Sequence, residues 1–90
     1  MMDLKNHRDR IDAIDDQLTA LFKERMEIVS KVAEYKNEHG LPVTDSAREK
    51  QILEDRTADA GELKPYVRRF FKHIMKLSKE YQKERITDEE

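Results

Sequence analysis

Residues 4–38 read LKNHRDRIDAIDDQLTALFKERMEIVSKVAEYKNE, and this stretch decides the fold. Apolar side chains recur in it at alternating steps of three and four, the rhythm of one helix face. The stripe comprises Leu4, His7, Ile11, Ile14, Leu18, Leu21, Arg25, Ile28, Val32 and Tyr35. Asp3 suits the N-cap of this helix, and Gly40 fits the position just past its C-terminal end. Pro42 prevents the helix from continuing. The pattern predicts one helix over residues 4–38.

Such a helix is too long to be covered by its own chain. At 1.5 Å per residue it spans roughly 52 Å. A compact globule of 90 residues has a radius of gyration of only about 12 Å. No Gly or Pro lies between Asp3 and Gly40 to break the helix. We therefore expect an intertwined homodimer, in which antiparallel pairing of the long helices covers the exposed stripe.

Two more helices are expected. The second should begin near Asp45 or Ser46 and run to about residue 58, and Ser46 has capping-box spacing to Glu49. The third should cover about residues 63–84, and the charged tail from Arg85 to Glu90 is expected to fray. Its apolar stripe is Leu63, Val67, Phe70, Ile74, Leu77 and Tyr81. The predicted fold is all-α, with three helices per chain in a single domain over residues 1–90.

The composition excludes several classes of protein. Charged residues make up 42% of the chain and apolar residues 37%, which suits amphipathic helices with charged outer faces. A net charge of −2 gives no basic excess for binding nucleic acid. The chain has no cysteine, hence no disulfide framework or zinc-thiolate site. No apolar run approaches the length of a membrane span, and no leader-like apolar segment follows the N-terminus. We expect a cytoplasmic protein.

Arg25 interrupts the apolar stripe with a charge that needs an anion, from either the protein or a ligand. Lys36 follows eleven residues later, which returns it to within about 20° of the same face at a distance of roughly 16 Å. Arg8 lies roughly 25 Å from Arg25 along the same helix, too far to share a small-molecule site. In an antiparallel dimer, however, the partner's Arg8 can reach it.

Further polar residues fall on single helix faces. Ser78 and Gln82 share a face of the third helix at i and i+4. On the second helix, one face carries Asp45, Arg48 and Glu49. Brought together, these groups predict a pocket for a small, hydroxylated polyanion. The sequence shows no Ser/His/Asp or Cys/His arrangement and no glycine-rich phosphate loop, and its three histidines are not spaced as a metal site.

Structural alternatives exist for each of these residues. Arg25 can pair with an acidic residue across the dimer and set its register. Lys36 can be a surface lysine whose stem lies along apolar groups. Asp45 can be only an N-cap, and Glu49 only a capping-box partner. Arg8 and Arg48 are ordinary surface residues when taken singly, so only the joint pattern points to a site.

The chain resembles the all-helical class of chorismate mutases from Leu4 to about Lys83. The matching stretches begin with residues 8–12 (RDRID), 21–25 (LFKER) and 32–36 (VAEYK). They continue with residues 42–45 (PVTD), the pair Arg48-Glu49, and residues 78–82 (SKEYQ). The resemblance implies a dimer of three-helix chains with two equivalent active sites, each borrowing an arginine from the other subunit. It also implies conversion of chorismate to prephenate by a pericyclic rearrangement that uses no cofactor and no metal.

The resemblance also implies a role for each residue. Arg25 and Arg8 of the partner subunit would clamp the two substrate carboxylates, with Ser78 touching one of them. Lys36 would reach a carboxylate and the ether oxygen, to which Gln82 would be the second donor. Asp45 and Glu49 would lie near the ring hydroxyl, Glu49 being the stronger candidate, and Arg48 would support this region. The catalytic set is then Lys36, Gln82, Arg25 and Glu49.

Two other functions remain open from the sequence. An isochorismate pyruvate-lyase would use a similar cationic pocket on the same fold. A non-catalytic helical dimerisation or regulatory module would instead pair Arg25 with a protein carboxylate. Association with a separate shikimate-pathway enzyme also remains open, as a partner in addition to chorismate and the second subunit.

Overall fold

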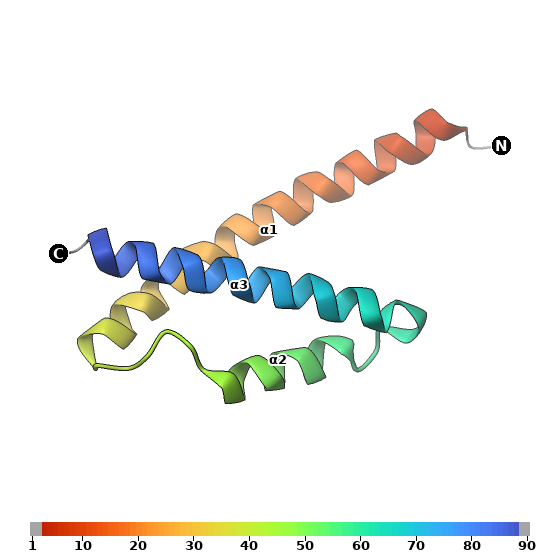
Figure 1. Ribbon diagram of the computed structural model, residues 1–90. Coiled ribbons are helices and arrows are strands. Elements are labelled where there is room, and N and C mark those ends of the chain that lie inside the picture. Colours follow the sequence, from red (N-terminus) through yellow and green to blue (C-terminus); the bar gives the residue numbers. More distant parts are fainter. Residues whose placement is uncertain (1–2, 89–90) are drawn as a thin grey trace.

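A computed structural model describes residues 3–88 of the chain. Its elements are α1 (Leu4–Glu38), α2 (Ser46–Thr57), the short 3₁₀ helix η1 (Gly61–Leu63) and α3 (Lys64–Asp88). Within this part of the chain there is no β-strand, so the predicted all-α class with three helices is confirmed. Figure 1 shows α2 running alongside α3, while the C-terminal half of α1 crosses α3.

The helix α1 has the bounds that its periodicity predicts. The Asp3 side chain accepts a hydrogen bond of 3.0 Å from the backbone N–H of Asn6, as an N-cap should. At the other end Gly40 has a φ of +65°, a conformation in which a side chain is strained. The N–H of Leu41 bonds to the Lys36 carbonyl at 2.8 Å, and that of Gly40 bonds to Asn37 at 3.4 Å. This pair of bonds is a Schellman motif, and it turns the chain back toward α2.

The helix α2 is capped by Asp45 and not by the predicted Ser46–Glu49 capping box. The Asp45 carboxylate accepts from the backbone N–H of Arg48 at 3.0 Å, and the helix begins at Ser46. Because Asp45 is the N-cap, Glu49 lies one position too late to complete a box. The Glu49 carboxylate instead contacts Lys79 of α3. The capping-box prediction was therefore wrong, although the predicted start of the helix was right.

The helix α3 extends beyond its predicted end at residue 84. It runs to Asp88, so the expected fraying is wrong for residues 85–88, while Glu89 and Glu90 lie outside the described residues. A contact with α1 explains the extension, because Arg85 Nε donates to Ser30 Oγ at 3.1 Å. At the other end, Leu63 belongs to η1 and Pro65 lies in the first turn of α3, where its missing N–H costs little.

The core is small and lies where all three helices meet. Its buried apolar residues are Ala33 of α1, Leu53 of α2 and Met75 of α3. Buried polar residues lie among them, namely Ser30, Thr57, Ser78 and Gln82. Among the described residues no large side chain is completely buried. A core this limited leaves room for polar groups to face an internal cavity.

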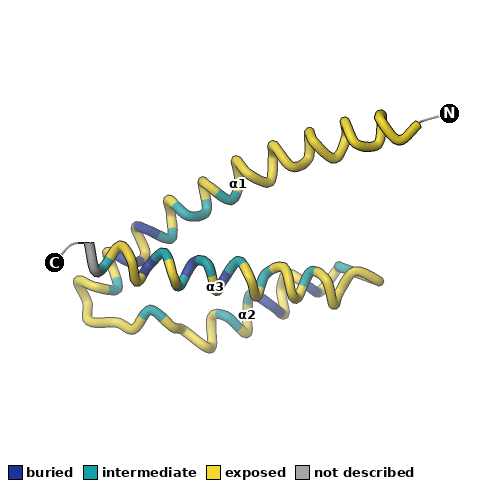
Figure 2. The backbone as a smooth tube through the Cα atoms, turned by 45° about the horizontal axis from the view of Figure 1, so that its top comes forward, coloured by how far each residue is buried: buried dark blue, intermediate teal, exposed yellow. Residues whose placement is uncertain are grey.

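The N-terminal half of α1 projects from this core with its apolar stripe uncovered. Figure 2 shows this half as exposed throughout, and Figure 1 shows it leading away from the other two helices. Leu4 is 62% exposed, Ile11 55% and Leu21 62%. The radius of gyration is 16.6 Å and the longest dimension is 57 Å, so the chain is far from a compact globule. No helix within residues 3–88 combines the length and the apolar character that crossing a membrane requires.

Candidate active site

A cavity of about 140 Å³ lies between the C-terminal half of α1, the beginning of α2 and the C-terminal half of α3. Seven of the eight predicted site residues line it: Arg25, Lys36, Asp45, Arg48, Glu49, Ser78 and Gln82. Apolar side chains complete the wall, namely Val29, Val32, Val43, Ile52 and Met75. The fold thus brings together polar groups from three helices over a separation of 57 residues.

Arg25 is held from α3 by a hydroxyl. Its Nη1 donates to Ser78 Oγ at 2.7 Å, and the Ser78 hydroxyl in turn donates to the carbonyl of Ile74 at 2.8 Å. A guanidinium has five N–H donors, so this single bond fixes its direction and leaves others for a ligand. Burial lowers the pKa of Arg25 from its ordinary value, and the nearby positive charge of Arg48 lowers it further. Both effects indicate a positive charge that an anion would stabilise.

Lys36 is held between the loop and α3. Its Nζ donates to the carbonyl of Val43 at 2.9 Å and to Oε1 of Gln82 at 3.5 Å. An ammonium has three donors, so one N–H remains to point into the cavity. Because the carbonyl end of the buried Gln82 amide faces Lys36, its Nε2 group is the end that can donate to a ligand. The two side chains form a pair of adjacent donors.

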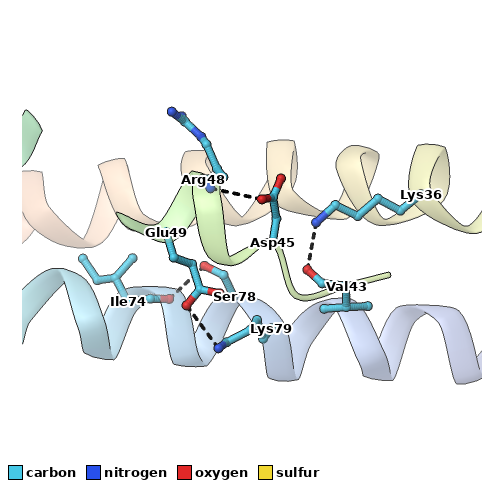
Figure 3. A network of polar contacts seen from close by, with 8 residues as sticks. All are labelled: Lys36, Val43, Asp45, Arg48, Glu49, Ile74, Ser78 and Lys79. Carbon is cyan, nitrogen blue, oxygen red and sulfur yellow. Dashed lines mark hydrogen bonds and ion pairs between the residues drawn. The ribbon is translucent and has the colours of Figure 1, made fainter. Parts of the chain in front are cut away.

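The first turn of α2 contributes one more cation and two carboxylates. Figure 3 shows Asp45 engaged with the backbone of Arg48, and Glu49 extending toward α3. The guanidinium of Arg48 points away from Glu49 in this view, and its Nη1 donates to Oε1 of Gln51 at 3.2 Å. Asp45 therefore acts first as the N-cap that positions this turn, whereas Glu49 is the carboxylate that faces α3.

Lys79 is a lining residue that the sequence did not single out. Its Nζ lies 3.2 Å from Oε1 of Glu49, and the two side chains are 32% and 28% exposed. On α3 it directly follows the predicted Ser78. A lysine beside polar neighbours gives no sequence signal of burial, and its partner lies on another helix. Only the packing of α2 against α3 reveals it.

Arg8 is the predicted site residue that does not line the cavity. It lies on the exposed N-terminal part of α1, seventeen residues before Arg25. The rise of an α-helix separates the two by roughly 25 Å, which agrees with the expectation that Arg8 of the same chain cannot join this site. Within residues 3–88, no cluster of three His, Asp or Glu side chains has an arrangement that could hold a metal ion.

Comparison with known proteins places the sequence of this chain in a family. The family described as chorismate mutase type II matches residues 7–83, which is most of the chain. The chain belongs to the type II chorismate mutase family. The match includes every residue of the candidate active site, from Arg8 to Gln82.

Among its relatives in this family are longer proteins. A T-protein of Haemophilus influenzae is 42% identical over 57 residues, 63% of this chain and 15% of that protein. A chorismate mutase of Methanocaldococcus jannaschii is 43% identical over 47 residues, 52% of this chain and 48% of that protein. The chain thus spans about half of the chorismate mutase and a small part of the T-protein. The comparison with solved structures gave no significant match.

Proposed function

We propose that this protein is a chorismate mutase, an isomerase that converts chorismate to prephenate. The observation that carries the proposal is the convergence of seven polar residues, predicted from three separate helices, on one cavity. Membership of the type II chorismate mutase family supports the reaction class, as does the similarity to the chorismate mutase of Methanocaldococcus jannaschii. The step belongs to the synthesis of phenylalanine and tyrosine.

The rearrangement places a particular demand on such a site. A C–O bond breaks as a C–C bond forms within one molecule, so no nucleophile, proton transfer or cofactor is required. The protein must hold the compact reactive conformer and stabilise the negative charge that grows on the ether oxygen. A rigid cavity lined with fixed cationic donors is suited to both tasks.

The substrate carboxylates are assigned to the arginines. A guanidinium presents paired N–H groups that match a carboxylate, and the bond to Ser78 fixes the direction of Arg25. Ser78 is assigned to the edge of the same carboxylate. The second carboxylate is assigned to Arg8 of the partner subunit.

The ether oxygen is assigned to Lys36 and Gln82. Their mutual contact of 3.5 Å keeps the two donors adjacent, and the Val43 carbonyl restrains the ammonium. Because Gln82 is a neutral amide, its donor is present at any pH. The ring hydroxyl is assigned to Glu49, with Asp45 nearby, while Arg48 supports this turn of α2.

The proposed active unit is a homodimer. The uncovered apolar stripe on α1 favours a second copy as its cover, since an exposed apolar face of this length is unfavourable in water. Antiparallel pairing would carry Arg8 of the partner subunit toward the cavity that contains Arg25. Sedimentation or light scattering should find twice the chain mass, and a stable monomer would contradict the dimer.

An assay with purified protein tests the function. Chorismate should be consumed with formation of prephenate, while isochorismate should yield no pyruvate. Pyruvate from isochorismate in place of prephenate from chorismate would establish the lyase. Inactivity toward both would favour the non-catalytic module.

A further inference from the structure

The roles assigned above include Glu49 but not Lys79, with which it forms an ion pair. This pair joins α2 to α3 across the cavity, with Nζ and Oε1 3.2 Å apart (Figure 3). Both residues line the cavity, and each side chain is about two-thirds covered. An ion pair at such a depth is better shielded from water than one on the open surface. It therefore affects what the cavity can bind.

The charge balance of the cavity depends on this pair. Four cations line it (Arg25, Lys36, Arg48, Lys79), with two carboxylates (Asp45, Glu49). This excess of two positive charges within one chain, to which Arg8 of the partner subunit would add a third, favours a dianion such as chorismate. Without Lys79, Glu49 would present an unneutralised carboxylate to a substrate that carries two of its own, and like charges at such distances repel.

The geometry also makes Lys79 a constraint on Glu49. Within residues 3–88, the hydrogen bond from Lys79 restrains the carboxylate of Glu49. It holds Oε1, and a carboxylate has a second oxygen that can still accept from a ligand. A carboxylate that accepts from a ring hydroxyl must be held in this way if it is to orient the ring.

We propose that Lys79 is a positioning residue, which acts through Glu49 by neutralising and orienting the carboxylate that receives the hydroxyl of the substrate. The inference rests on the proposed function. It predicts that the effect of Lys79 on turnover of chorismate depends on the presence of the Glu49 carboxylate.

A double-mutant cycle tests this dependence. Lys79→Met keeps the length of the side chain and removes the charge, and we expect it to raise KM about tenfold, with a smaller loss in kcat. Glu49→Gln should lower kcat by itself. Combining the two should bring KM back toward that of the unsubstituted protein, because the amide needs no counter-charge. Lys79→Arg should retain most of the activity.

Controls separate this role from a merely structural one. Lys76→Met removes an exposed lysine one turn earlier on α3, outside the cavity, and should leave both kinetic constants unchanged. Thermal unfolding of Lys79→Met should resemble that of Lys76→Met, since a partly exposed ion pair contributes little to stability. If Lys79→Met unfolds, Lys79→Gln also removes the charge, and its effects with Glu and with Gln at position 49 measure the same coupling.

Three outcomes would overturn the inference. If Lys79→Met lowers activity by the same factor whether position 49 holds Glu or Gln, Lys79 acts on the substrate directly. No loss in Lys79→Met would remove any role. An unsubstituted protein that forms no prephenate would overturn both the proposed function and this inference, whereas an active protein with additive losses would overturn the inference alone.

Discussion

At the scale of single residues, the donors proposed for the ether oxygen lead to a prediction about how the rate depends on pH. Gln82 is buried, and its carbonyl oxygen accepts from Lys36, so its amide Nε2 group is assigned as donor. A glutamate in this position could donate only when protonated, and an ordinary glutamate has a pKa of about 4.3. If Gln82 is this donor, the identity of its side chain sets whether the rate depends on acid.

Replacing Gln82 with Glu should make the reaction acid-dependent. Below its pKa the carboxyl group donates, and above it the charged form repels the developing negative charge on the ether oxygen, so the rate should climb as pH falls. Measuring kcat/KM between about pH 8 and about pH 4 would show this, because that range includes the ordinary pKa of glutamate. The unsubstituted protein should show no acid requirement from Gln82. The same pH profile in both proteins would contradict the assigned role.

Lys36 offers a second prediction at this scale. If its ammonium stabilises the transition state, Lys36→Ala should lower kcat by roughly 10²-fold or more. Steady-state kinetics with chorismate would measure the loss. Lys31→Ala is the matched control, because Lys31 is an exposed lysine of α1 that does not line the cavity. A loss confined to KM would show that Lys36 only binds substrate.

At the scale of elements, the turn after α1 determines where α2 begins. Gly40 has a φ of +65°, and a Cβ added there would meet no atom within 4 Å. The cost of Gly40→Ala is thus conformational and not steric, about 1 kcal/mol for a left-handed alanine. In a domain of this size, that loss lowers the midpoint of thermal unfolding by about 4–8 °C.

Gly40→Asn provides the control for this third prediction. Asparagine tolerates the left-handed conformation better than alanine, so its unfolding midpoint should lie between those of Gly and Ala. Calorimetry or circular dichroism at equal protein concentration would order the three proteins. An alanine variant as stable as the asparagine variant would show that the backbone changes its conformation at this turn.

The helices were predictable because their signals are local. The stripe of α1 and the cap at Asp3 lie within the segment they define, and the structure has the same bounds. The predictions were wrong where a contact with another helix determines the local structure. Arg85 bonds to Ser30 of α1 and keeps α3 helical past residue 84, and Glu49 pairs with Lys79 and not with the N-terminus of its own helix.

The cavity was predictable only in part from spacing. Helical geometry put Arg25 and Lys36 on one face and Ser78 and Gln82 on another, but their individual roles came only from the family resemblance. The burial of Ser78 and Gln82 follows from packing against α1, which no local pattern encodes. Lys79 was missed because it reads as one of many lysines on α3. The pairing of charges across helices is the part of a site that a single sequence reveals least.

At the scale of the whole molecule, the N-terminal half of α1 is the main apolar surface that the single chain leaves uncovered. Ile14 is 54% exposed and Leu18 46%, although both lie on the same stripe as the covered part of the helix. An apolar face of this length favours association. If the cover is a second copy in antiparallel register, Arg8 and Arg25 act in the same site only when they come from different subunits.

Mixing two inactive variants tests that arrangement. In a dimer of one Arg8→Ala chain and one Arg25→Ala chain, one site lacks both arginines and the other has both. Chance pairing makes half of the dimers mixed, so about a quarter of all sites should be intact. Heterodimers isolated by two different affinity tags should have about half of the full activity, because one of their two sites is complete.

The matched control pairs Arg25→Ala with Lys36→Ala. Both side chains belong to the cavity of their own chain, so each site of this heterodimer lacks one of them and activity should not return. Recovery in the first mixture but not in the second would assign Arg8 to the opposite subunit. If neither mixture recovers while heterodimers do form, Arg8 has no part in the partner's site. The second carboxylate of the substrate would then need another cation, and Arg48, whose guanidinium points away from Glu49, is the one that lines the same cavity.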